Sequence, residues 1–288
     1  LPGRFAVRAE SRRSRLYHRD AIAQRVTAAI ADALGAGPEP GDQPVVLARF
    51  LDDTCTLSLD TTGPALHDRG YRQEPGPAPL REDIARALVL ASGWDRRRPL
   101  IDPFAGAGTI AIEAALLARG QAPGRHRKFA FHATRLYDAA RFAALQAEAD
   151  AAVRPGARIL ASDRRADCIA MTERNAERAG VRADLEVAAA PLSSSPWRAE
   201  LAHAGAVVSD PPHGKRLGDP RALVKLYRAL GAWLAGAPAD CAIALVAADR
   251  RLALRTGLPL KTAFLTPHGG RKVRALVRPL SGGAAAPA

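Results

Sequence analysis

The sequence predicts an α/β protein in which a mostly parallel sheet follows a small α+β module. Strands and helices alternate regularly from residue 79 onward, which is typical of a parallel sheet covered by helices on both faces. The earlier residues lack this alternation, and a stretch rich in turn residues separates the two parts. With 288 residues, 48% of them hydrophobic and 25% charged, the chain can bury a core without disulfides or metal ions.

Residues 1–60 are expected to form the α+β module. Residues 4–9 alternate like a strand, and residues 18–34 carry apolar side chains at helical spacing. Residues 45–50 and 55–60 flank a short polar turn, which predicts a hairpin.

The linker spans residues 61–78, and a second domain of alternating strands and helices is expected over residues 79–280. A basic insertion at 120–136 interrupts this alternation, and the low-complexity residues 281–288 are expected to be disordered. The chain begins at Leu1 rather than Met, so we expect that part of the first module is missing. The predicted helices span residues 79–92, 108–119, 166–180 and 221–235, with an Ala-rich helix that ends near 152. The predicted strands span residues 99–102, 157–163, 183–187, 205–210, 241–248, 260–266 and 272–277.

The charge of the chain indicates a polyanionic partner. Lys and Arg number 42 against 29 Asp and Glu, which gives a net charge of +13. From residue 250 to the end there are eight basic residues and no acidic one. The segment GRHRKFAF at 124–131 mixes cations with aromatic residues, so it is either a loop that contacts RNA or a packed crossover.

Composition also excludes several classes of protein. No apolar run reaches 18 residues and no signal-peptide pattern is present, so we expect no membrane association and a cytoplasmic location. Cys55, Cys168 and Cys241 are widely separated and lack the spacing of a zinc site, so each is expected to be a small buried hydrophobe. No metal site is predicted.

The first motif that indicates a site is IDPFAGAGTIAIEAA at 101–115. A buried strand ends in Asp102, a turn containing Gly106 and Gly108 follows, and a helix then begins. In an open parallel sheet, this arrangement places a ligand beyond the carboxyl end of the strand. The glycines alone do not choose the cofactor, since GxGxxA is also the dinucleotide fingerprint. The acid that NAD binding needs about 20 residues later is absent, whereas Asp163 ends the next strand.

The second motif is VVSDPPHGKRLGD at 207–219. A strand carries Asp210 to the same sheet edge as Asp102. Pro211 and Pro212 then fix the backbone and remove N–H donors, so the loop is rich in acceptors. Such a loop suits an exocyclic amino group, which must be oriented rather than deprotonated.

Together these motifs carry a specific resemblance to a known family. DPFAGAGT resembles the S-adenosylmethionine-binding motif of class I methyltransferases, which have a Rossmann-like sheet, and DPPHG resembles the (D/N)PP(Y/F) motif of those that methylate exocyclic base amines. Residues 59–83 are similar to the linker of bacterial THUMP-domain RNA methyltransferases, a family that includes a guanine-N2 methylase of large-subunit ribosomal RNA. Residues 5–26 resemble the second half of a THUMP domain, and HGGRKVRALV at 268–277 resembles the family's C-terminal hairpin.

The resemblance assigns roles to particular positions. It implies that S-adenosyl-L-methionine binds at a set of positions in the linker, the glycine turn and the second strand end: Pro79, Leu80, Asp102, Pro103, Phe104, Gly106, Gly108, Thr109 and Asp163. It implies that Asp210, Pro211 and Pro212 hold the target amine and that His213 stacks on the base. The family usually has an aromatic residue at 213 and an acid near Pro191, and this chain has neither.

The resemblance implies methylation of guanine-N2 in large-subunit ribosomal RNA by direct transfer from the cofactor. The same chemistry on tRNA guanine or on adenine remains open, as does a noncatalytic RNA-binding assembly factor that retains the fold. An NAD oxidoreductase is a third hypothesis, which the missing acid disfavours.

Overall fold

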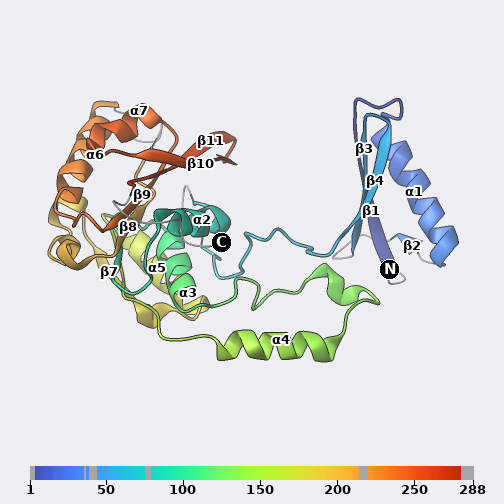
Figure 1. Cartoon of the computed structure of the whole chain (residues 1–288), viewed down its shortest axis with the longest axis horizontal. Coiled ribbons are helices and arrows are strands. Elements are labelled where there is room, and N and C mark those ends of the chain that lie inside the picture. Colours follow the sequence, from blue (N-terminus) through green and yellow to red (C-terminus); the bar gives the residue numbers. More distant parts are fainter. Residues whose placement is uncertain (1–3, 36, 39–43, 75–78, 214–219, 280–288) are drawn as a thin grey trace. The chain divides into compact units, whose positions relative to one another are not determined.

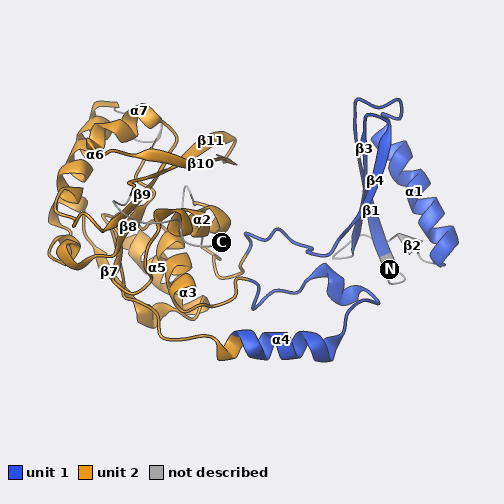
Figure 2. Cartoon of the chain, in the orientation of Figure 1, with its two compact units in different colours: residues 1–68, 124–149 blue, residues 69–123, 150–288 orange. Residues whose placement is uncertain are grey.

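The computed structural model describes residues 4–35, 37–38, 44–74, 79–213 and 220–279 (Figure 1). It divides into two compact units, residues 1–68 with 124–149 and residues 69–123 with 150–288 (Figure 2). The division falls inside the predicted linker, and most of the predicted basic insertion groups with the first unit. The domain bounds inferred from the sequence stay a prediction, and the predicted tail at 281–288 lies outside the described residues.

The first unit is built on a sheet with the strand order β2-β1-β3-β4 within the described residues. β1 pairs in parallel with β3, and β3 and β4 form the predicted hairpin. Its turn residues Asp52 and Asp53 both have positive φ, 47° and 62°, the geometry of two-residue turns that match the twist of the strands. The elements are β1 (Arg4–Arg12), α1 (Arg19–Leu34), β2 (Gly37–Pro38), β3 (Val45–Leu51) and β4 (Thr54–Asp60).

The predicted insertion packs against the linker within this unit. The Arg127 guanidinium donates to the carbonyls of Ala65 and Asp68 at 2.8 and 2.7 Å, and it also bonds the Pro64 carbonyl. Its side chain lies over the Phe129 ring, 5.6 Å from the centroid. The packed-crossover interpretation therefore holds for Arg127 and the aromatic residues, while RNA contact by the surrounding cations stays a prediction. Ring contacts join Phe129, Phe131, His132, Tyr137 and Phe142. The insertion contains the 3-10 helix η1 (Ala130–Ala133) and α4 (Ala139–Ala151).

The second unit contains the predicted mostly parallel sheet, with the order β10-β11-β9-β8-β5-β6-β7 in the described part of the chain. β7, β6, β5, β8 and β9 run parallel, whereas β11 is antiparallel to both β9 and β10. The predicted α/β class with an antiparallel C-terminal hairpin is thus confirmed. The strands are β5 (Leu100–Asp102), β6 (Ile159–Asp163), β7 (Leu185–Ala189), β8 (Ala206–Ser209), β9 (Ala242–Ala247), β10 (Lys261–His268) and β11 (Arg271–Val277). The α-helices are α2 (Glu82–Ser92), α3 (Thr109–Ala118), α5 (Ala166–Arg178), α6 (Pro220–Leu234) and α7 (Arg250–Ala253). Short 3-10 helices are η2 (Arg182–Asp184), η3 (Leu192–Ser194), η4 (Pro196–Arg198), η5 (Glu200–His203) and η7 (Leu254–Thr256).

Each face of this sheet has its own core, because side chains alternate along the central strands. Leu100 faces one core together with α2, α3 and α5, and its neighbour Ile101 faces the other together with α6. Val208 and Val207 divide in the same way. Burial on both faces explains why β9 is apolar throughout and why β8 is apolar up to Ser209, the buried polar residue at its carboxyl end.

Two expectations from the sequence are wrong in detail. The helix predicted over 79–92 begins at Glu82, because Arg81 has extended dihedral angles (φ −67°, ψ 145°) and the Leu80 carbonyl accepts a hydrogen bond from Arg72 at 2.5 Å. Cys168 and Cys241 are buried as expected, but Cys55 is exposed because it lies on β4, the edge strand of its sheet.

Candidate functional site

Asp102 is the last residue of β5, and its carboxylate is buried beneath the predicted site. The residue is 1% exposed. Its Oδ1 accepts from the Ser209 hydroxyl at 2.5 Å and from the Phe104 N–H at 3.1 Å. These bonds join the ends of β5 and β8, so the two predicted motifs meet at one edge of the sheet.

The turn after β5 has the conformation that its glycines allow. Gly106 and Gly108 have φ of +56° and +83°, values that other residues rarely adopt. A Cβ at Gly106 would point into open space, whereas one at Gly108 would lie 2.7 Å from the Thr172 Cγ2. α3 begins at Thr109, and its first turn has no side-chain cap, so its N–H groups remain available as donors.

Asp163 ends β6 and lies against this turn, as the sequence predicts. Its Oδ2 accepts from the Gly106 N–H at 3.1 Å, and its Oδ1 accepts from the Arg165 N–H at 3.0 Å. The carboxylate is therefore held in a fixed orientation at the neighbouring strand end.

Asp210 follows β8 and is partly buried together with His213. The His213 Nδ1 lies 3.2 Å from the Asp210 Oδ1 and 3.1 Å from the Pro211 carbonyl oxygen. The hydrogen bond with Asp210 raises the pKa of His213 above its ordinary value. The remainder of the motif, residues 214–219, lies outside the described residues.

The electrostatics of the site favour a cation. Burial raises the pKa of Asp102 to about 7, and the charges of Asp210 and Asp163 add to the shift. Hydrogen bonds from Ser209 and Phe104 oppose it. Asp210 and Asp163 thus each disfavour the ionised form of Asp102 at the carboxyl edge of the sheet, and a positively charged ligand would offset that effect.

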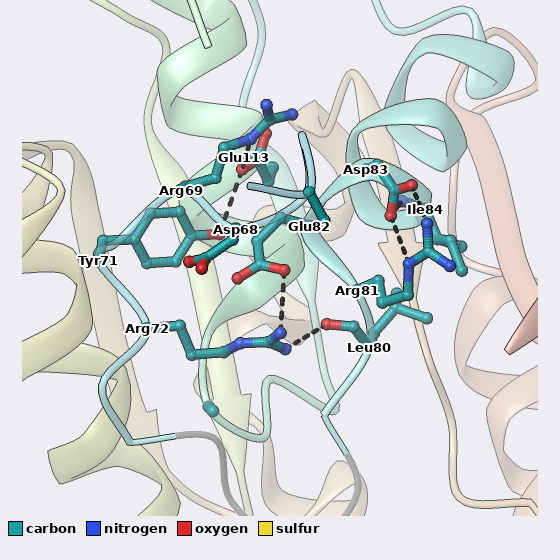
Figure 3. A network of polar contacts seen from close by, with 12 residues as sticks. Asp68, Arg69, Tyr71, Arg72, Leu80, Arg81, Glu82, Asp83, Ile84 and Glu113 are labelled. Carbon is teal, nitrogen blue, oxygen red and sulfur yellow. Dashed lines mark hydrogen bonds and ion pairs between the residues drawn. The ribbon is translucent and has the colours of Figure 1, made fainter. Parts of the chain in front are cut away.

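Pro79 and Leu80 belong to a segment that precedes α2, which we name the strap (residues 69–74 and 79–81). Leu80 is buried in the same core as Ala105 of the glycine turn. The Arg72 guanidinium links the two parts of the strap: it donates to the Leu80 carbonyl and to the Glu82 carboxylate, the latter at 2.9 Å (Figure 3).

A second part of the strap is fixed to α3. Arg69 and Tyr71 point toward Glu113, which is completely buried (Figure 3). The Arg69 Nε and the Tyr71 hydroxyl donate to Glu113 Oε1 at 3.3 and 3.2 Å, and the Arg86 guanidinium lies 3.7 Å from Oε2. The strap is thereby anchored beside the helix that begins at the glycine turn.

The remaining predicted cofactor positions surround the turn. Pro103 and Thr109 are buried, and Phe104 is partly buried against the core that contains Ile101. The structure therefore brings the strand-end and turn positions together. Near Pro191, which is exposed, the Ser195 hydroxyl accepts from the Trp197 N–H and caps η4.

Sequence analysis missed three polar residues near this edge. Thr172 and Asn175 lie on α5 and bond the carbonyls of the turn. His268, at the end of β10, has a buried Nδ1 without a hydrogen-bond partner, and burial lowers its pKa against the opposing charge of Asp210. Helical periodicity could have shown that Thr172 and Asn175 share a face, but not that this face meets the turn.

The described residues contain no group of three or more His, Cys, Asp or Glu side chains arranged to hold a metal ion. In the same part of the chain, no helix is both long enough and apolar enough to cross a membrane.

The fold and the two strand-end motifs define a class I methyltransferase domain. The family model described as RMKL-like, methyltransferase domain, matches residues 69–257. The chain belongs to this family.

Similar proteins agree with that assignment. The ribosomal RNA large subunit methyltransferase K/L of Vibrio campbellii is 37% identical over 213 residues, which cover 72% of this chain and 30% of the relative. The chain thus spans less than a third of the length of that curated relative. A crystal structure of SMU.472, described as a candidate methyltransferase complexed with SAH, has 26% identity and a TM-score of 0.81 and covers 96% of this chain and 75% of that chain. A Listeria monocytogenes protein, described as a predicted N6-adenine-specific DNA methylase, has 28% identity and a TM-score of 0.79 over 94% of this chain and 72% of that chain.

Proposed function

We propose that the chain transfers a methyl group from S-adenosyl-L-methionine to an exocyclic amine of an RNA base, with guanine-N2 of large-subunit ribosomal RNA as the first target. The observation that carries the proposal is the cluster of Asp102, Asp163 and Asp210 around a glycine turn in a family of methyltransferase domains. An enzyme with this substrate works in the cytoplasm.

The residues present fit the cofactor. Burial and two neighbouring carboxylates raise the pKa of Asp102, and the sulfonium and ammonium groups of the cofactor are positive charges that would favour its ionised form. Open space at Gly106 leaves room for close approach of a ligand to the backbone. Asp102, Phe104, Gly106 and Gly108 would hold the methionine part. Within the described residues each Asp163 oxygen accepts one hydrogen bond, which leaves a further lone pair on each for the ribose hydroxyls. Pro79, Leu80, Pro103 and Thr109 complete the proposed set.

The bound cofactor supplies an electrophilic methyl group for in-line transfer. The chain's contribution is to position the two reactants, an effect that can lower a barrier by about 7–11 kcal/mol. Asp210 and the Pro211 carbonyl would accept hydrogen bonds from the base amine and orient its lone pair. The proton that the amine loses on methylation would pass to Asp210 or to water. Pro212 fixes the loop, and His213 would stack on the base, which must first leave its own stack.

The RNA substrate is proposed from two observations. The net charge of +13 suits a polyanion, and the Vibrio relative is named for large-subunit ribosomal RNA. The likeness to the Listeria protein favours adenine as the second candidate base, and tRNA remains the second candidate RNA.

The test is incubation with unmodified ribosomal RNA and S-adenosyl-L-methionine that carries a deuterated methyl group, followed by mass spectrometry of the nucleosides. Labelled N2-methylguanosine is the expected product. Labelled methyladenosine would support the assignment as a methyltransferase but show that guanine is not the target base. An Asp210→Ala variant should bind RNA but transfer no label, and wild-type-like transfer by that variant would contradict the role of Asp210. Absence of both label and cofactor binding in the wild type would favour the noncatalytic RNA-binding hypothesis.

A further inference from the structure

α5 approaches the glycine turn from one side and bonds its carbonyls. The Thr172 hydroxyl donates to the Gly106 carbonyl at 3.2 Å, and the Asn175 Nδ2 donates to the Ala107 carbonyl at 3.0 Å. Both side chains are completely buried. Two successive carbonyls of the turn are therefore fixed toward α5.

This arrangement determines where the N–H groups of the turn point. The described peptide bonds are trans, so each N–H is directed opposite to the carbonyl of the preceding residue. The Gly108 N–H turns away from α5 and bonds the Ala105 carbonyl at 2.8 Å. The Ala107 N–H also turns away from α5, and it makes no backbone hydrogen bond within the described residues.

The Asn175 side chain is itself held by the strap. Its Nδ2 donates a second bond to the Glu74 carbonyl at 3.2 Å, and its Oδ1 accepts from Arg178 at 3.0 Å. Arg174 and Arg178 both bond the Glu74 carboxylate, which lowers the pKa of Glu74 to about 2. Asn175 thus has hydrogen bonds on both ends of its amide, and its orientation is fixed.

We propose that Thr172 and Asn175 are positioning residues for the cofactor, because they orient the Gly106–Ala107–Gly108 peptides so that the Ala107 N–H faces the bound ligand. The acceptor in the ligand would be an anionic or carbonyl-type oxygen, which the carboxylate of an amino-acid cofactor provides. The inference rests on the proposed function, since it concerns the same cofactor. It adds two residues that never touch the cofactor and act through the backbone.

The test compares Thr172→Val, which loses the hydroxyl but keeps the shape, with Thr172→Ser, which keeps the hydroxyl. Asn175→Ala is the second variant. Thr256→Val is the control, because Thr256, in η7, is also buried and its hydroxyl donates to the Ala253 carbonyl at 2.8 Å, besides accepting from the Leu258 N–H at 3.3 Å. The probe is S-adenosylhomocysteine, with its Kd measured by calorimetry and the melting temperature of each variant measured alongside.

We expect Thr172→Val and Asn175→Ala to raise the Kd about tenfold, the effect of losing one orienting hydrogen bond. Thr172→Ser should recover most of the affinity. The control should lower the melting temperature by a similar amount and leave the Kd within about twofold of the wild type. At saturating cofactor, kcat should change little, while the KM for the cofactor rises.

An unchanged Kd in Thr172→Val, together with a lowered melting temperature, would show that the hydroxyl is only structural and would overturn the inference alone. If Asn175→Ala does not fold, the Kd values of Thr172→Val and Thr172→Ser test the inference by themselves. A wild-type protein that binds neither S-adenosylmethionine nor its product would overturn the proposed function and the inference with it.

Discussion

Asp102 is held in an environment that opposes its charge. It has two hydrogen-bond donors, Ser209 and Phe104, yet burial and the neighbouring carboxylates outweigh them and raise its pKa to about 7. The ligand-free site therefore carries an unfavourable charge, which binding of a cation would remove. The sequence placed this residue at a strand end, but the size of its pKa shift follows from packing.

The raised pKa leads to a pH-dependent stability. The folded protein holds the Asp102 proton more tightly than the unfolded chain, whose pKa is near 3.8. This contribution to stability is complete below the unfolded pKa and is lost as the pH rises through about 7. In the wild type, this effect should lower the free energy of unfolding by about 3 kcal/mol between about pH 5 and pH 8. We expect Asp102→Asn, whose amide oxygen can keep both bonds made by Oδ1, to lack this pH-dependent loss of stability. Denaturant unfolding of the ligand-free wild type and variant at both pH values checks this. Parallel pH profiles for the two proteins would contradict it.

The roles of Thr172 and Asn175 could not be predicted from the sequence. Polar residues on an amphipathic helix are equally compatible with solvent exposure, and only the packing of α5 against the turn reveals their partners. Asp163 and Asp210 were predictable because the ends of parallel strands meet at one edge of a sheet, whatever the details of packing.

At the scale of elements, the β5–turn–α3 unit depends on two glycines with different requirements. Gly106 needs only its positive φ, whereas Gly108 also needs the absence of a Cβ beside Thr172. The turn sequence predicted the first requirement. The second follows from the position of α5.

These requirements separate the effects of two substitutions. Gly108→Ala should lower the free energy of unfolding by about 2–4 kcal/mol, because backbone strain of about 1–2 kcal/mol adds to a 2.7 Å overlap. Gly106→Ala should lower the free energy of unfolding only by the backbone strain of about 1–2 kcal/mol. It should also weaken cofactor binding, since its Cβ points into the open space of the site. Denaturant unfolding and S-adenosylhomocysteine titration measure the two effects. Equal losses of stability in both variants would show that the overlap at Gly108 is relieved.

The strap and α3 are joined by a buried charge network. Glu113 has no exposed surface and lies between Arg69 and Arg86, while the Tyr71 hydroxyl supplies a further bond. Burial raises the pKa of Glu113 even beside two arginines. Residues 69–74 belong to the stretch that the sequence marks only as a turn-rich linker, because ion pairs between distant segments leave no periodic pattern.

Breaking this network should destabilise the second unit. We expect Glu113→Gln to lower the free energy of unfolding by about 3–5 kcal/mol, because it removes the buried negative charge that faces the partly buried Arg69 and Arg86 guanidinium groups. Tyr71→Phe should cost less, about 1.5–3 kcal/mol, because it removes one hydrogen bond to a charged acceptor. Chemical denaturation of both variants provides the comparison. A larger loss in Tyr71→Phe than in Glu113→Gln would reverse the ranking and show that the charges contribute little.

At the scale of the whole molecule, the net charge of +13 is the property most relevant to an RNA partner. Several arginines are already engaged within the chain, as Arg127 is on the linker carbonyls and Arg158 is with Glu186. The charge available to RNA is therefore smaller than the formal total. It must come from cations that lack such partners.

RNA affinity should accordingly depend strongly on salt. If six to ten phosphates are contacted, the affinity falls by about 10³–10⁵ between 50 and 200 mM salt. Fluorescence anisotropy with a labelled ribosomal RNA fragment measures this slope. S-adenosylhomocysteine binding, which involves few charges, serves as the control and should change little. A flat salt dependence for RNA would show that phosphate contacts are not the main source of affinity.

The sequence by itself determined the order of strands and helices, the α/β class and the carboxylates at the strand ends. These follow from local rules: side-chain periodicity, turn residues, and the common edge at which parallel strands end. The tertiary structure alone decided that α2 begins at Glu82, that the basic aromatic insertion packs on the linker, and that α5 holds the carbonyls of the glycine turn. Each of these depends on contacts between residues far apart in the chain. Such contacts are chosen by packing and hydrogen-bond satisfaction, which no local pattern records.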